Sequence, residues 1–219
     1  MWVPLLEKAF AKYFGNYSHT IAGDPNTALQ TMQGGPGFSY YFDNDHTPSW
    51  ISRYNDETSL EDTWNLLVKH TAAKDLMTMW TPGKSDSYMN KFGLYNRHAF
   101  TVLGGVELAD GTRLVKIRNP HGKENYKGPW GDTDPVWTDA LLEEANKLLG
   151  EDEAHVLDVG DAQFWMPFTD TEENLGGYYG SVKGLLVNPD VTGWHSDYFL
   201  RLDDDGTDTT EAKFYDGNR

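Results

Sequence analysis

The sequence contains no cysteine among its 219 residues, and this absence limits its chemistry. Without a thiol the chain can form no disulfide, no thiolate metal site and no cysteine nucleophile of its own. Long apolar runs are also missing, since no window approaches 18 apolar residues and charged residues soon follow Met1–Pro4. We therefore predict no membrane span and a cytoplasmic location, or a place within a cytoskeletal or other large intracellular assembly.

Basic residues are few as well. There are 18 Lys and Arg against 34 Asp and Glu, which gives a formal net charge of -16. A charge of this sign repels phosphate backbones and anionic lipids, so we expect no nucleic-acid partner and favour a cation or a basic protein. The composition is 38% hydrophobic and 14% aromatic, which is enough to predict a folded chain with a sizeable core.

Apolar periodicity predicts a mixture of helices and strands. We expect helices over 4–14, 25–33, 58–74 and 138–149, the second with Leu29 and Met32 buried and the last with Leu148 inward. Strands are predicted over 76–80, 99–106, 114–117, 163–168 and 181–187. After residue 190 the periodicity is lost apart from 198–200, which indicates an acidic tail or linker.

The first of these helices has an apolar stripe that includes Leu5, Leu6, Phe10 and Tyr13, with charged residues opposite. So short an amphipathic helix needs a surface to cover its stripe. We therefore expect a protein partner over this face, and an isolated chain that tends to aggregate.

The segment 93–132 places chemically useful side chains beside strand and turn signals. Two strands with a turn at 109–112 form a predicted hairpin, which carries His98 near its first end and Asn119 at its last. A two-residue turn would set Asn119 opposite Val102, roughly 13 Å along the strand from His98 at about 3.3 Å per residue. A bulge at Gly104 and Gly105, or a shifted turn, must close that gap if the two side chains meet.

Six sequence motifs occur together in one order: WVPLLEKAFAKYFGNY, GLYNRHAFTV, IRNP, GPWGD, QFWMPFTD and LLVNPD. In this order, over about residues 2–190, the chain resembles calpain-type cysteine proteases. The resemblance implies an α+β fold: a papain-like second lobe with antiparallel β-sheets and flanking helices, preceded by short helices. By the same resemblance, residues 1–40 are the helical tail of the first catalytic lobe, 41–190 are the second lobe and 191–219 are the acidic tail or linker.

The resemblance assigns roles to two residues in the hairpin. In a Cys-His-Asn site, His98 is the base and Asn119 fixes its tautomer and orientation. The alternatives from the residues alone are a hydrogen-bonded histidine at a strand end and a turn residue before proline. His121 departs from the family, which usually has tryptophan there to shield the pair from water.

The second lobe of calpains also binds calcium through two acidic loops. The matching positions are Asn125, Asp132, Asp161 and Gln163, of which only Asp132 and Asp161 keep a carboxylate. Calcium prefers oxygen ligands and its affinity depends on their charge, so we expect no tight calcium binding. The alternative interpretation is ordinary acidic loop residues.

Two functions are compatible with these observations. The chain is either the His- and Asn-bearing part of a calpain-like cysteine endopeptidase acting on protein substrates, or a non-catalytic pseudoprotease that serves as a binding or structural subunit. The missing cysteine, His121 and the depleted calcium loops favour the second function, whereas retention of His98 and Asn119 favours the first. In either case we predict that the isolated chain has no peptidase activity, because it has no cysteine nucleophile of its own.

Overall fold

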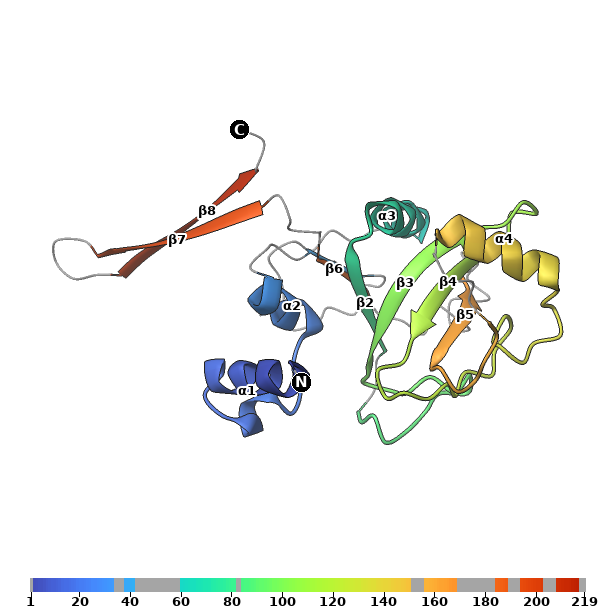
Figure 1. The fold of residues 1–219 in the computed structure, drawn as a ribbon, viewed down its shortest axis with the longest axis horizontal. Helices are drawn as coiled ribbons and strands as arrows, with labels where there is room; N and C mark the ends of the chain where they lie inside the picture. Colours follow the sequence, from blue (N-terminus) through green and yellow to red (C-terminus); the bar gives the residue numbers. More distant parts are fainter. Residues whose placement is uncertain are drawn as a thin grey trace.

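The computed structural model describes residues 2–33, 38–41, 60–81, 84–150, 156–168, 184–188, 194–202 and 208–216. Figure 1 shows the arrangement of the elements. The helices are α1 (Val3–Tyr13), η1 (Tyr17–Thr20), α2 (Pro25–Gln33), α3 (Leu60–Ala73) and α4 (Asp139–Leu149). The strands are β1 (Phe38–Tyr41), β2 (Leu76–Trp80), β3 (Ala99–Glu107), β4 (Arg113–Arg118), β5 (Gln163–Pro167), β6 (Gly184–Asn188), β7 (Trp194–Leu202) and β8 (Asp208–Asp216). Most of the stretch before α3, including the first two residues of the helix predicted over 58–74, lies outside the described residues.

Six of the strands form one sheet in the order β1-β6-β2-β3-β4-β5, and its five strand pairs are all antiparallel. Helices together with an antiparallel sheet confirm the predicted α+β class. Strand β1 pairs with β6 over all four of its residues, although residues 38–40 precede the expected lobe boundary. The extents of the lobes themselves remain predictions.

Two hydrophobic clusters cover the two faces of this sheet. Strand β4 contributes Val115 and Ile117 to one cluster and Leu114 to the other, as expected for residues that alternate along a strand. Helix α3 adds Trp64 and Leu67 to the first cluster, and α4 packs on the second. The sheet is therefore fixed from both sides, which holds the ends of β3 and β4 in place for the site.

Some predicted burial is wrong at the margins of the helices. Met32 is 47% exposed and Leu148 is 51% exposed, although both were expected to face the core. In α4 the buried positions follow the i, i+4 spacing of Ala145 and the partly buried Leu141 and Leu149, so Leu148 falls on the flank. Helix α2 contacts β6 near the edge of the sheet, and this edge does not reach Met32.

Helix α1 leaves its apolar stripe open to solvent. Leu5 is 68% exposed and Tyr13 is 72% exposed, while Ala11 is the helix's buried residue. In Figure 1 this helix lies apart from the sheet, beside the turn that leads to α2. The stripe predicted to need a covering surface has none within the described part of the chain.

Strands β7 and β8 were not predicted. They pair with each other over nine residues each and form a separate two-stranded ribbon, which extends away from the six-stranded sheet in Figure 1. The acidic residues around them hid the strand signal, because charged residues interrupt the apolar alternation on which strand prediction depends. Among the described residues, no helix has both the length and the apolar character needed to cross a membrane.

Candidate active site

The β3–β4 hairpin differs from the predicted hairpin at its turn. Leu108 N donates to Thr112 O at 2.9 Å and Gly111 N donates to Leu108 O at 2.8 Å. Three residues therefore lie between the last paired positions, with Gly111 at φ +87°. A three-residue loop that ends in a left-handed glycine is a common hairpin connection, and it moves the register by one residue from the two-residue turn.

A bulge moves the register by one residue more. Gly104 pairs with Lys116 but Val102 pairs with Ile117, so Leu103 has no partner across the hairpin. The last pair in this register is Thr101 with Arg118. One step further along both strands, Asn119 lies opposite Phe100. Asn119 is then two residues from His98 and on the same face, a diagonal spacing of roughly 7 Å that side chains can bridge. The predicted gap is closed by the turn and the bulge together.

The structure joins His98 and Asn119 directly. His98 Nε2 lies 2.9 Å from Asn119 Oδ1. Because an amide oxygen only accepts, Nε2 carries the proton and Nδ1 is left with a free lone pair. Asn119 is 2% exposed, and its Nδ2 donates to the carbonyl of Lys123 at 2.8 Å, which fixes the orientation of the amide.

The backbone of His98 is held by β2. Thr81 N donates to His98 O at 3.0 Å, and His98 N donates to Thr81 Oγ1 at 3.2 Å. The preceding residue, Arg97, has φ +45°, which is uncommon for a residue other than glycine. This turn sets the direction in which the imidazole leaves the strand.

Aromatic rings surround the imidazole of His98. The ring centroids of Phe100 and Tyr95 lie 4.7 Å and 5.6 Å away, and that of His121 lies 4.2 Å away. Burial lowers the pKa of His98 below its ordinary value of 6.5. The bond to Asn119 acts in the opposite direction, the nearby His121 lowers the pKa further, and Asp86 raises it. The ring is therefore disposed to be a neutral base near pH 7.

The acidic loops form a second cluster. Asp132 is 9% exposed, and within the described residues its carboxylate has only a weak contact with the backbone of Asp158 and the neighbouring Glu124 to offset its burial. Burial, reinforced by the charges of Asp161 and Asp158, raises the pKa of Asp132 to about 6. Glu124 was not predicted, yet burial and the charge of Asp132 raise its pKa to about 7.

The four positions matched to the calcium loops do not all meet. Asp161 accepts from the backbone of Gln163 at 2.7 Å, and Asn125 donates to the Tyr95 hydroxyl at 3.3 Å, toward the His98 site. The residue that lies beside Asp132 is Glu124, which comes one position before Asn125. Its position next to a predicted ligand was the one signal that could have identified it. Within the described ranges, no three acidic or histidine side chains are arranged to hold a metal ion.

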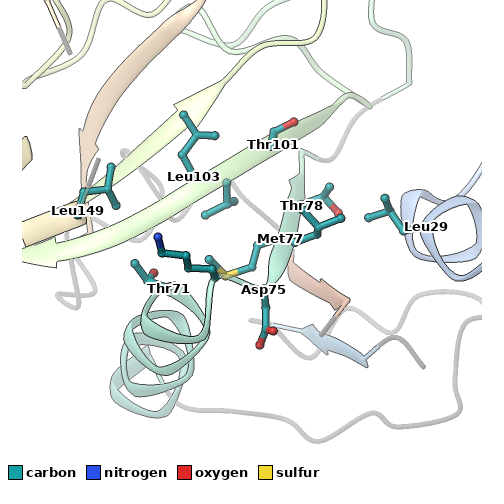
Figure 2. Close-up of a pocket in the computed structure, with 12 residues that line it drawn as sticks. Leu29, Thr71, Asp75, Met77, Thr78, Thr101, Leu103 and Leu149 are labelled. Carbon is teal, nitrogen blue, oxygen red and sulfur yellow. The ribbon is translucent and has the colours of Figure 1, made fainter. Parts of the chain in front are cut away.

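A pocket of about 370 Å³ lies away from both clusters. Figure 2 shows Thr78 and Thr101 from β2 and β3 on its wall, with Leu29 of α2 facing them. Thr71 of α3 and Leu149 at the end of α4 line its other end. Neither His98 nor Asn119 lines this pocket, so it is not part of the candidate site.

Comparison with protein families matches residues 1–177 to the family described as calpain family cysteine protease. The calpain-type cysteine protease DEK1 of Arabidopsis thaliana is 28% identical over an alignment of 227 positions including gaps, which covers 96% of this chain and 10% of the relative. Calpain-12 of Mus musculus is 30% identical over 208 residues, covering 90% of this chain and 25% of the relative. Calpain-9 of Rattus norvegicus is 29% identical over 196 residues, covering 87% and 25%.

The chain thus spans a tenth to a quarter of the length of these relatives. The family match covers the whole segment from α1 to β5, including the β3–β4 hairpin. The motifs, the fold and the matched relatives agree: this chain belongs to the calpain family of cysteine proteases.

Proposed function

We propose that this chain supplies the histidine and the asparagine of a Cys-His-Asn endopeptidase site. The observation that carries the proposal is the 2.9 Å contact between His98 Nε2 and Asn119 Oδ1. It leaves Nδ1 of His98 as the basic atom, in a ring held by a buried and fully oriented amide. Such an arrangement is suited to general base catalysis.

In the proposed reaction, Nδ1 of His98 accepts the proton of a cysteine thiol that another polypeptide segment provides. The thiolate attacks the carbonyl carbon of a peptide bond, and the resulting imidazolium then gives its proton to the leaving amine. Water hydrolyses the thioester, with His98 again as the base. Asn119 keeps Nε2 protonated throughout, and its bond stabilises the imidazolium.

The surface for the cysteine-bearing segment is the exposed stripe of α1. Leu5 and Tyr13 are mostly exposed, and Trp2 at the start of the helix is 70% exposed. Burial of apolar surface contributes about 25 cal/mol per Å², so a stripe of large side chains favours a protein partner. We propose that the partner is the remaining, cysteine-bearing part of the first catalytic lobe, of which residues 1–40 are the tail.

A reconstitution experiment tests this function. The chain alone is expected to leave casein intact. After addition of the cysteine-bearing first lobe of a relative such as calpain-12, cleavage is expected, and His98→Ala is expected to abolish it. His19→Ala is the matched control, because His19 is an exposed histidine that bonds the backbone of Phe14. Cleavage by the chain alone, or reconstituted cleavage that survives His98→Ala, contradicts the proposal.

The second candidate is a pseudoprotease that binds a partner without cleaving it. The exposed face of α1 supports it as well as the first candidate, since either function needs a covered stripe. Stable association with the first lobe, but no cleavage by the mixture, would favour this second function.

Calcium is a candidate ligand of the acidic loops. Asp132, with two buried carboxylate oxygens, fits a cation in its chemistry, and Asp161 and Glu124 would complete a carboxylate set. A bound ion would neutralise their repulsion and join the loop of Asp132 to that of Asp161. Because no three of these groups converge in the described residues, the loops must move to bind it. We expect calorimetry to find a dissociation constant above the micromolar range.

A further inference from the structure

His121 contacts the candidate site through both its backbone and its ring. Its backbone N–H donates to Asn119 Oδ1 at 3.1 Å, the same oxygen that accepts from His98 Nε2. The shared acceptor ties the two residues to one atom, and their ring centroids lie 4.2 Å apart with a 44° angle between the planes. The bond holds the backbone of His121, and so the start of its side chain, close to His98.

Tyr95 closes another side of this arrangement. Its ring lies 5.0 Å from His121 and meets it edge-on at 75°, and it also contacts the ring of His98. The Tyr95 hydroxyl accepts from Asn125, and its backbone carbonyl accepts from Thr81. Tyr95 is thus anchored at two points. His98 is confined between Phe100 on its own strand and the pair of Tyr95 and His121.

We propose that His121 is a positioning residue whose imidazole covers His98 and whose positive charge, when present, opposes a positive charge on His98. The inference rests on the proposed function for its catalytic consequence. His121 lies against the imidazole of His98. Unlike an aliphatic side chain or a phenyl ring in the same place, its own imidazole can become charged.

The charges around the two rings support this coupling. Two unit charges about 4 Å apart shift a pKa by roughly 0.7 pH unit even in water. The titratable groups that bear on His98 are His121 from the loop after β4, and Asp86 and Tyr95 from the loop before β3. Asp86 raises the pKa of His98 while His121 lowers it, after the larger effects of burial and Asn119.

The consequence for the proposed reaction is a loss of activity in acid. The reaction needs His98 to hold a proton after it deprotonates the thiol, and a proton already on His121 opposes that imidazolium. A positive charge on His121 therefore makes His98 a weaker base without displacing any residue.

Histidine titration by NMR on the full 219-residue chain tests the coupling without any peptidase activity. His121→Phe keeps an aromatic cover and removes the charge, and His121→Gln is a second neutral variant should the first fold poorly. In either variant the titration midpoint of His98 is expected to rise, because the charge that lowers it is removed. His19→Phe, which removes a distant exposed histidine, is expected to leave that midpoint in place. An unchanged midpoint in both His121 variants overturns the coupling.

The covering role has its own measurement. In His121→Ala the Nε2 proton of His98 is expected to exchange with water faster than in the wild type, whereas His121→Phe retains the wild-type rate. Equal rates in all three proteins contradict the covering role. Because none of these measurements uses substrate, a failed reconstitution with the first lobe would refute the proposed function while the coupling still stands.

Discussion

Asn119 forms three side-chain hydrogen bonds from a buried position. It accepts from His98 and from the backbone of His121, and it donates to the carbonyl of Lys123. One side chain therefore links the candidate base to the loop that leads into the acidic cluster. Its removal would affect stability and basicity together.

Asn119→Ala is expected to lower the free energy of unfolding by about 1–3 kcal/mol, because buried groups lose their partners. It is also expected to lower the pKa of His98 further, since the bond to Asn119 raises it. Urea unfolding and NMR titration measure the two effects. Asn16→Ala, which removes an exposed cap bond to His19, is the control and should leave His98 unaffected. A wild-type His98 titration in Asn119→Ala would argue against the bond.

The acidic cluster predicts how stability depends on pH. The pKa values of Glu124 and Asp132 are raised to about 7 and about 6, so the folded state holds protons that the unfolded state releases. Their stabilising contribution is present below about pH 4 and is lost as the pH rises toward 7. His98, with a lowered pKa, acts oppositely and destabilises the fold as the pH falls below 6.5.

Glu124→Gln is therefore expected to flatten the decline in unfolding free energy between pH 5 and pH 8. The amide cannot ionise, so the repulsion with Asp132 does not develop. Unfolding curves at a series of pH values measure this slope. Glu143→Gln on the exposed side of α4 is the control, and an equal slope in wild type and Glu124→Gln would refute the assignment.

At the scale of the element, the β3 bulge depends on a glycine. A Cβ on Gly104 would lie 2.5 Å from Leu149 Cδ1 and 2.6 Å from Thr71 Cγ2, too close on both sides. Helices α3 and α4 thus contact the strand where its register shifts. The bulge is tied to the packing of both helices, which explains why a short apolar sequence cannot reveal it.

Gly104→Ala is expected to destabilise the chain by about 1–3 kcal/mol, since overpacking displaces neighbouring side chains. Gly23→Ala is the matched control, because a Cβ there meets no atom within 4 Å. Thermal and urea unfolding compare the two variants. Equal stability of Gly104→Ala and wild type would show that the neighbouring side chains move away without cost.

The elements themselves were largely predictable, since β3 and α4 follow simple apolar periods within a residue or two of the observed bounds. The meeting of His98 with Asn119 was not, because it depends on a three-residue turn and on one bulged residue. Glu124 was missed since a loop residue has no periodicity to reveal its burial. Exposure of Met32 and Leu148 depends on where the sheet ends, which no local pattern records.

At the scale of the whole molecule, the described chain is a packed sheet with an uncovered amphipathic helix beside it. We expect the isolated chain to self-associate through the stripe of α1. The double variant Leu5→Gln with Tyr13→Gln should reduce association, because it removes two of the more exposed apolar side chains. Light scattering across a concentration series measures it, with Lys8→Gln as control. A monodisperse wild-type monomer contradicts this expectation.

The bulged residue gives the hairpin a tolerance for insertion and deletion. His98 and Asn119 are 21 positions apart, yet Leu103 takes no partner, so a chain shorter by that residue can keep the pairing of Val102 with Ile117. A two-residue turn between the same flanking pair shortens the segment again without moving either end. The same pair can therefore occur at shorter spacings in related chains. Its presence there is better judged from strand register than from a fixed interval between histidine and asparagine.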